Sequence, residues 1–203
     1  MPTNDMTRRQ AMTGLVAAGV LLALGRPVLA AATDRASALV TTLAQELTQL
    51  VRAGRSEAQV VSAFQGILSR YVDMPAVAAS VLGPPWRGAS GGQRQAFVAA
   101  FQGYLARKYG KQFRDYKYAQ IAVTGAKDGG KAGVLVSTTV KRPGQDDVGV
   151  GWQVSERSGS AKVVNLVIEG VSMLANERAE VGAMLDAQKG SVDGLIAQLR
   201  SLA

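Results

Sequence analysis

The ionisable side chains that this chain offers for chemistry are carboxylates, tyrosines, lysines and arginines, because its 203 residues include no histidine and no cysteine. The missing histidines remove the most common general base, the usual serine triad and most catalytic metal sites. The missing cysteines exclude disulfides, thiolate metal ligands and cysteine nucleophiles. The composition therefore favours a binding protein over an enzyme, with no catalytic residue, metal or cofactor expected.

Three charged residues stand out by position, and each has a structural explanation. Asp73 lies directly before Met74-Pro75, which is the arrangement of a helix N-cap followed by a first-turn proline. Arg178 is expected to pair with a carboxylate or a carbonyl, and Glu169 is a candidate for that carboxylate. Paired carboxylates can perform acid–base chemistry, but no spacing here brings two of them together. We therefore predict structural roles for all three.

The first half of the chain is predicted to consist of helices that present a broad apolar surface. Residues 34–53 carry an apolar stripe at helical spacing, and Ser56 with Gln59 predicts the cap of a second helix. Residues 64–109 then predict a helix, a short helix that ends at Gly83, and a long helix that begins with a capping box of Ser90 and Gln93. The apolar face of the long helix consists of Phe97, Val98, Phe101, Tyr104, Leu105 and Tyr109.

The second half changes to a period of two residues, which is typical of strands. Four strands are predicted, over 116–126, 131–142, 147–156 and 161–169. Short turns join them, so the sheet should be a curved, largely antiparallel meander. Gly149 and Gly151 alternate with apolar residues; we favour a bulge or bend there over space for a ligand or a packed helix. Two helices follow, over 173–187 and after Ser191, which makes an α+β domain.

Residues 1–32 are predicted to be a cleaved secretory signal, followed by one domain over 33–203. Arg8-Arg9 precede an uncharged stretch, and small residues follow at the expected cleavage region after Ala30 or Ala32. The apolar run is shorter than the roughly 20 residues that span a bilayer. Thr7-Arg8-Arg9-Gln10 is similar to the start of a twin-arginine motif, and an ordinary general-secretion signal is the alternative. Either route leads to the periplasm.

The formal charge of +8 comes from basic residues that are scattered along the chain. A basic surface could meet anionic lipid headgroups or an acidic protein partner. No basic stripe, zinc pattern or base-stacking motif is present, so we do not expect nucleic-acid binding. The sequence contains no oligomer signal, and a monomer is expected.

Several motifs in their order and spacing resemble the MlaC family, whose members are periplasmic phospholipid-binding shuttle proteins of the toluene-tolerance type of lipid transport system. The motifs are Tyr71-Val72-Asp73-Met74, Val81-Leu82-Gly83, Trp86-Arg87, Gln93-Arg94, Phe97, Phe101, Tyr104-Leu105 and Ile168-Glu169-Gly170-Val171-Ser172. The resemblance implies a nuclear-transport-factor-like sheet wrapped by helices around an apolar cavity. It also implies transfer of phospholipid between an outer-membrane lipoprotein complex and an inner-membrane ABC transporter with its substrate-binding subunit, which maintains outer-membrane lipid asymmetry.

By this resemblance, twelve apolar side chains are candidates for contact with the lipid. They are Val81, Leu82, Trp86, Phe97, Phe101, Leu105, Val134, Val136, Val150, Trp152, Leu166 and Ile168. Each of them could equally be ordinary core, because a filled core and a core with a tunnel need the same residue types.

Three departures from the family pattern leave the cargo open. The tryptophan that the family usually has near residues 161–165 is missing. Asn165 stands where the family usually has an aspartate, and Glu177 stands where an aromatic residue is expected between Asn176 and Arg178. A divergent subgroup is one explanation, and one such subgroup is associated with hopanoid lipids. A small-molecule hydrolase or isomerase on the same fold and an interaction module without cargo are the competing hypotheses.

Overall fold

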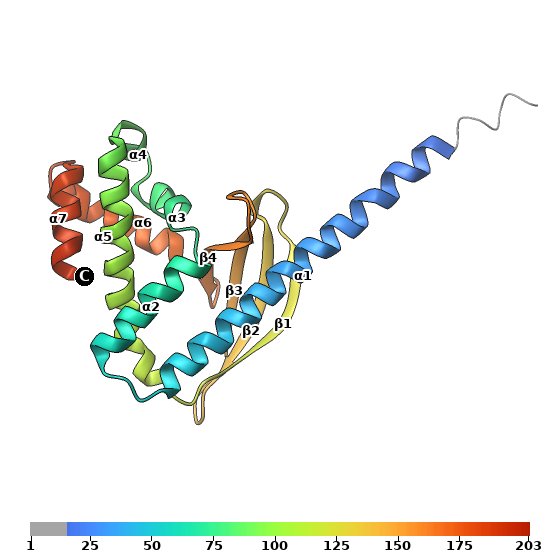
Figure 1. The fold of residues 1–203 in the computed structure, drawn as a ribbon, viewed down its shortest axis with the longest axis horizontal. Helices are drawn as coiled ribbons and strands as arrows, with labels where there is room; N and C mark the ends of the chain where they lie inside the picture. The colour runs from blue at the N-terminus through green and yellow to red at the C-terminus, as the bar shows by residue number, and fades with distance from the viewer. Residues whose placement is uncertain (1–15) are drawn as a thin grey trace, which may run out of the picture.

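The computed structural model describes residues 16–203, and it describes side chains for residues 30–112 and 116–203; Arg8-Arg9 lie outside the described residues. Figure 1 shows a helical half beside a curved sheet. The helices are α1 (Val16–Arg52), α2 (Glu57–Tyr71), α3 (Met74–Leu82), α4 (Pro85–Gly88), α5 (Gly91–Gly110), α6 (Met173–Ala187) and α7 (Val192–Leu202), with 3₁₀ turns η1 (Lys111–Tyr116) and η2 (Gly130–Ala132). The strands are β1 (Gln120–Asp128), β2 (Val134–Lys141), β3 (Val148–Ser155), β4 (Lys162–Ile168) and β5 (Val171–Ser172).

Helix α1 continues through the boundary that the sequence predicts at residue 32. Its N-terminal half extends away from the rest of the molecule, whereas its C-terminal half lies across the sheet (Figure 1). Among the side chains described from residue 30 onward, Ala36 is the first that is buried, and Arg35 forms a 2.7 Å ion pair with Glu156 beyond β3. None of the described helices is long and apolar enough to cross a membrane. The division into a leader and a single domain over 33–203 stays a prediction.

The predicted helix starts are confirmed at α2, α3 and α5. Ser56 with Gln59 and Ser90 with Gln93 form the reciprocal hydrogen bonds of a capping box. The Asp73 carboxylate accepts a 3.1 Å hydrogen bond from the backbone N–H of Ala76. These caps satisfy backbone donors that a helix leaves without partners in its first turn, and they fix where each helix begins.

The sheet is antiparallel throughout, in the order β1-β2-β3-β4-β5. It has five strands, whereas the sequence predicted four. The additional strand arises because Glu169 and Gly170 both take positive φ values, 48° and 81°, and turn the chain back on β4. Val171 and Ser172 then pair with the end of β4 before α6 begins. A two-residue strand is too short to give an alternating pattern in the sequence.

The two glycines of β3 lie on the face of the sheet that points away from the helices. A Cβ atom at Gly149 would lie 3.2 Å from a carboxylate oxygen of Glu169, and one at Gly151 would lie 3.2 Å from the Leu135 side chain. The register between β3 and β4 shifts at Gln153 instead of at either glycine, so the expected bulge is not there. The glycines make room for the neighbouring side chains of Glu169 and Leu135.

The buried residues form two separate apolar clusters. The helical cluster joins α2, α3, α5, α6 and α7, with Phe97, Phe101, Leu195 and Leu199 among its fully buried side chains. The sheet cluster joins α1 and α2 to the inner face of the sheet, around Val40, Val136, Val154 and Val163. The two clusters meet at Phe64 and Val72, which pack against both, and this junction positions the site.

Candidate functional site

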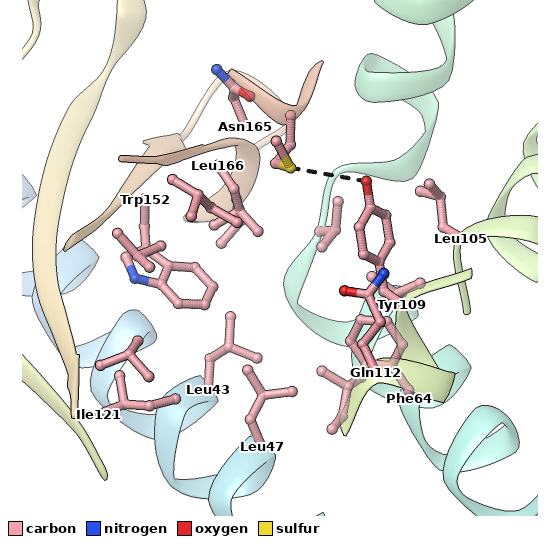
Figure 2. Close-up of a pocket in the computed structure, with 18 of the residues that line it drawn as sticks. Leu43, Leu47, Phe64, Leu105, Tyr109, Gln112, Ile121, Trp152, Asn165 and Leu166 are labelled. Carbon is pink, nitrogen blue, oxygen red and sulfur yellow. Dashed lines mark hydrogen bonds between the residues drawn. The ribbon is translucent and has the colours of Figure 1, made fainter. Parts of the chain in front are cut away.

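A cavity of about 290 Å³ lies between the sheet and the helices. Apolar side chains make up most of its lining, with contributions from α1, α2, α5, η1, four strands and α6. Figure 2 shows the arrangement: Trp152, Ile121 and Leu166 project from the sheet, Leu43 and Leu47 from α1, and Phe64, Leu105 and Tyr109 from the helical side. Such a space excludes water from an apolar guest and offers no charged group at its centre.

Half of the twelve candidate lipid contacts lie around this cavity. They are Phe101, Leu105, Val150, Trp152, Leu166 and Ile168. Val81, Leu82, Phe97 and Trp86 belong to the helical cluster instead, and Val134 and Val136 to the sheet cluster, away from the cavity. Trp86 lies at the α4–α5 corner, where the Arg94 guanidinium stacks 5.5 Å from its ring centroid.

The sequence candidates did not include the cavity wall formed by α1 and α2. Leu43, Leu47, Phe64 and Ile67 line it from these two helices. All four lie on the apolar stripes that predicted the helices, so the sequence indicated that they face inward. What it did not contain was a distinction between a stripe that packs on a neighbour and a stripe that faces an opening.

Trp152 is held in place by a buried hydrogen bond. Its indole N–H donates to the Thr138 hydroxyl at 2.9 Å, and that hydroxyl donates in turn to the backbone carbonyl of Val150. Thr138 is 2% exposed, so this pair satisfies polar groups that would otherwise be costly to bury. The indole is thereby fixed with its ring toward the cavity (Figure 2).

Asn165 connects the sheet to the start of α6 at one edge of the cavity. Its side-chain oxygen accepts hydrogen bonds from the backbone N–H of Leu174 at 3.0 Å and from the hydroxyl of Ser172 at 3.2 Å. An aspartate could accept the same two bonds, so the asparagine keeps the junction intact. The asparagine at this position therefore preserves the connection between β4 and the start of α6 that an aspartate would make.

A cluster of charged and tyrosine side chains from α5 and α6 forms one corner of the cavity. The Lys108 ammonium donates to Glu177 at 2.7 Å and to Glu180, and the Tyr109 hydroxyl donates to the same Glu177 oxygen at 2.5 Å. Tyr104 donates to Glu180 at 2.7 Å. Glu177 lines the cavity and is only 4% exposed, so its charge is held beside apolar surroundings by Lys108 and Tyr109.

The environment of this corner raises the pKa of each donor. Burial and the hydrogen bond to Glu180 raise the pKa of Tyr104 to about 12, and burial with the hydrogen bond to Glu177 raises the pKa of Tyr109. Burial lowers the pKa of Lys108, but its bonds to Glu177 and Glu180 outweigh this and raise it. At neutral pH these donors keep their protons, so they hold the carboxylates in place and do not exchange protons with a guest.

We expect stability to fall as the pH rises from about 10 to about 12. The pKa of Tyr104 is ordinarily 10.0 and is about 12 in the folded protein. The unfolded chain therefore loses this proton at a lower pH than the folded protein does, and the free energy of unfolding decreases across that window. Tyr109 and Lys108 shift in the same direction. Urea unfolding across this pH range measures the effect. Tyr104→Phe should give a flatter profile, and an unchanged profile in this variant would contradict the assignment.

The three charged residues singled out in the sequence have structural positions outside the cavity. Asp73 caps α3, as predicted. Glu169 accepts a hydrogen bond from the backbone N–H of Gly149. The ion pairs among the described residues do not include one between Glu169 and Arg178, so the suggested pairing is wrong. The Arg178 guanidinium lies against Gly83 at the end of α3, where a Cβ atom would come within 3.3 Å of it. Gly83 has a φ of 68°, so both its conformation and this contact require glycine.

Comparison with known proteins identifies the family of this chain and a solved structure with the same fold. The family model described as the MlaC protein matches residues 40–201, which include every strand and all of α2 to α6. The chain belongs to the MlaC family. A phospholipid-binding protein from Ralstonia solanacearum, whose structure was solved in complex with a phospholipid, has the same fold. Its sequence is 20% identical to this chain, and the TM-score between the two structures is 0.69. The match covers 82% of this chain and 96% of that one.

Proposed function

We propose that this protein is a lipid carrier that holds phospholipid acyl chains in the cavity between its sheet and its helices. The observation that carries the proposal is the lining of that cavity, where apolar side chains from α1, α2, α5 and the sheet converge. Membership of the MlaC family and the phospholipid complex of the Ralstonia solanacearum protein support the same reading.

The physical reason for a carrier is the cost of exposing acyl chains to water. Burial of each methylene is worth about 0.8 kcal/mol, so a chain of about 16 carbons gains on the order of 12 kcal/mol. A lipid that leaves a membrane must exchange one apolar environment for another of similar quality. The cavity supplies such an environment, and unloading would require a membrane partner that offers a comparable one.

We further propose that the protein works in the periplasm, between an outer-membrane lipoprotein complex and an inner-membrane ABC transporter. The predicted signal over residues 1–32 and the family membership support this placement. Arg8, Arg9, Arg26 and Asp5 in the predicted signal account for +2 of the formal charge of +8, and the remaining +6 suits approach to anionic headgroups at either membrane. A hopanoid in place of the phospholipid would use the same cavity and the same route.

Native mass spectrometry of protein purified without detergent tests the proposal. We expect an adduct with the mass of a diacyl phospholipid, identified by parallel lipid extraction. A hopanoid-sized adduct would keep the carrier and change its cargo. A protein that carries no lipid, and that stays lipid-free after incubation with phospholipid vesicles, would contradict the carrier function.

A further inference from the structure

The cavity lining extends to the end of the sheet where β2 turns into β3. Val140 and Val148 are paired across this hairpin, and both line the cavity. Val148 and Tyr116 are half-buried and Gln112 is exposed, whereas Trp152, in the middle of the lining, is buried. Val140 is buried, so the lining reaches the surface at Gln112 and Tyr116, beside the hairpin, and an amphiphile with its tails inside would place its polar end there.

Arg142 lies at this opening. The side chains of β2 that face the cavity side alternate through Thr138 and Val140, and Arg142 is the next residue in this series, just past the end of the strand. Its guanidinium lies 5.3 Å from the centroid of the Tyr116 ring, which lines the cavity. The stacking holds the flat cation in one orientation at the rim of the apolar space.

The Arg142 guanidinium lacks a carboxylate partner among the described residues, and its Nε is buried without a hydrogen bond. The adjacent Lys141 differs, because it is exposed and pairs with Asp147 at 3.7 Å. A buried donor on a charged group is costly to leave without an acceptor, so an anion supplied from outside would complete this site. Guanidinium groups match phosphate oxygens geometrically and bind them in a bidentate way.

We propose that Arg142 binds the phosphodiester of the cargo's headgroup while the acyl chains occupy the cavity. This inference rests on the proposed carrier function and deepens it. It assigns the anionic group of the lipid to one residue at the hairpin end, and it predicts that the carrier prefers a phospholipid to a neutral lipid with identical tails.

The test is a competition between two lipids with the same acyl chains, of which only one carries a phosphodiester headgroup. Lipid-free protein is incubated with mixed vesicles of a phosphatidylglycerol and a diacylglycerol that share the same acyl chains, and native mass spectrometry gives the ratio of bound lipids. We expect Arg142→Gln to lower the phospholipid-to-diacylglycerol ratio about tenfold, the effect of one charge-assisted contact. Lys141→Gln removes the same charge from the neighbouring residue and should leave the ratio within about twofold of the wild type.

The remaining outcomes separate this inference from the carrier function. If Arg142→Gln loads both lipids in the wild-type ratio, the phosphate contact is overturned and the carrier function stands. If the wild type loads neither lipid, the carrier function itself fails, and the headgroup assignment fails with it. If inorganic phosphate binds the lipid-free protein in an Arg142-dependent way while the variant keeps the wild-type lipid ratio, Arg142 serves free phosphate and the headgroup assignment is again overturned. Thermal unfolding of each variant verifies that it is folded.

Discussion

Replacing Ile168 with tryptophan should reduce lipid loading about tenfold while the protein stays folded. Ile168 ends β4, lines the cavity and is half-buried, so a larger side chain there occupies space that an acyl chain would fill. Exclusion of about two methylenes costs roughly 1.6 kcal/mol of binding, which is more than tenfold. Overpacking a filled core costs roughly 1–3 kcal/mol of stability. Because the indole enters an existing cavity, we expect Ile168→Trp to lose less than this. Lipid bound per protein, measured by native mass spectrometry, gives the result.

Val167→Trp is the matched control for this experiment. Val167 precedes Ile168 on the same strand, is also half-buried, and lies opposite Gly151 on the other face of the sheet, away from the cavity lining. We expect this variant to load lipid as the wild type does. If both variants load as much lipid as the wild type, the acyl chains lie elsewhere. If both lose loading to the same extent, the substitutions damage the sheet in general.

Replacing Lys108 with methionine should lower the free energy of unfolding by about 3–5 kcal/mol. Lys108 is the cation that holds the buried Glu177 carboxylate, at 2.7 Å, beside the apolar cavity. Without it that charge has no opposite partner, and one Glu177 oxygen is already buried without a hydrogen bond. The free energy of unfolding is obtained from urea denaturation followed by tryptophan fluorescence.

The double variant Lys108→Met with Glu177→Met distinguishes a buried-charge effect from a packing effect. Removal of both charges leaves no carboxylate to bury, so we expect most of the lost stability to return. Lys141→Met, which breaks an exposed ion pair with Asp147, should change stability by no more than about 1 kcal/mol. A double variant as unstable as Lys108→Met alone would mean that Lys108 acts through its aliphatic stem.

The secondary structure was readable from the sequence because its signals are local. Ser56, Asp73 and Ser90 each indicated a helix start within three residues, and the structure confirms all three. The change from helical to alternating periodicity gave the α+β class and the antiparallel sheet. The fifth strand was missed because its two residues form it only through pairing with β4.

The site was less predictable, since its defining features depend on distant parts of the chain. Phe97 and Phe101 are stacked neighbours on α5, with ring centroids 5.7 Å apart, yet only Phe101 lines the cavity. No local pattern separates two such residues. The charged corner likewise joins Lys108 to Glu177, 69 positions away, and Glu177 was noted only because it departs from a family pattern.

The position of the cavity between two separately closed cores has a consequence for the range of cargo. Phe101 and Leu105 belong to the helical cluster, and Leu43, Trp152 and Val163 to the sheet cluster, so opposite walls are anchored in different bodies. The width of the space is then set by the separation of the two clusters, which are joined through Phe64 and Val72. We therefore expect the space to widen for a thicker tail with little loss of the packing inside either cluster.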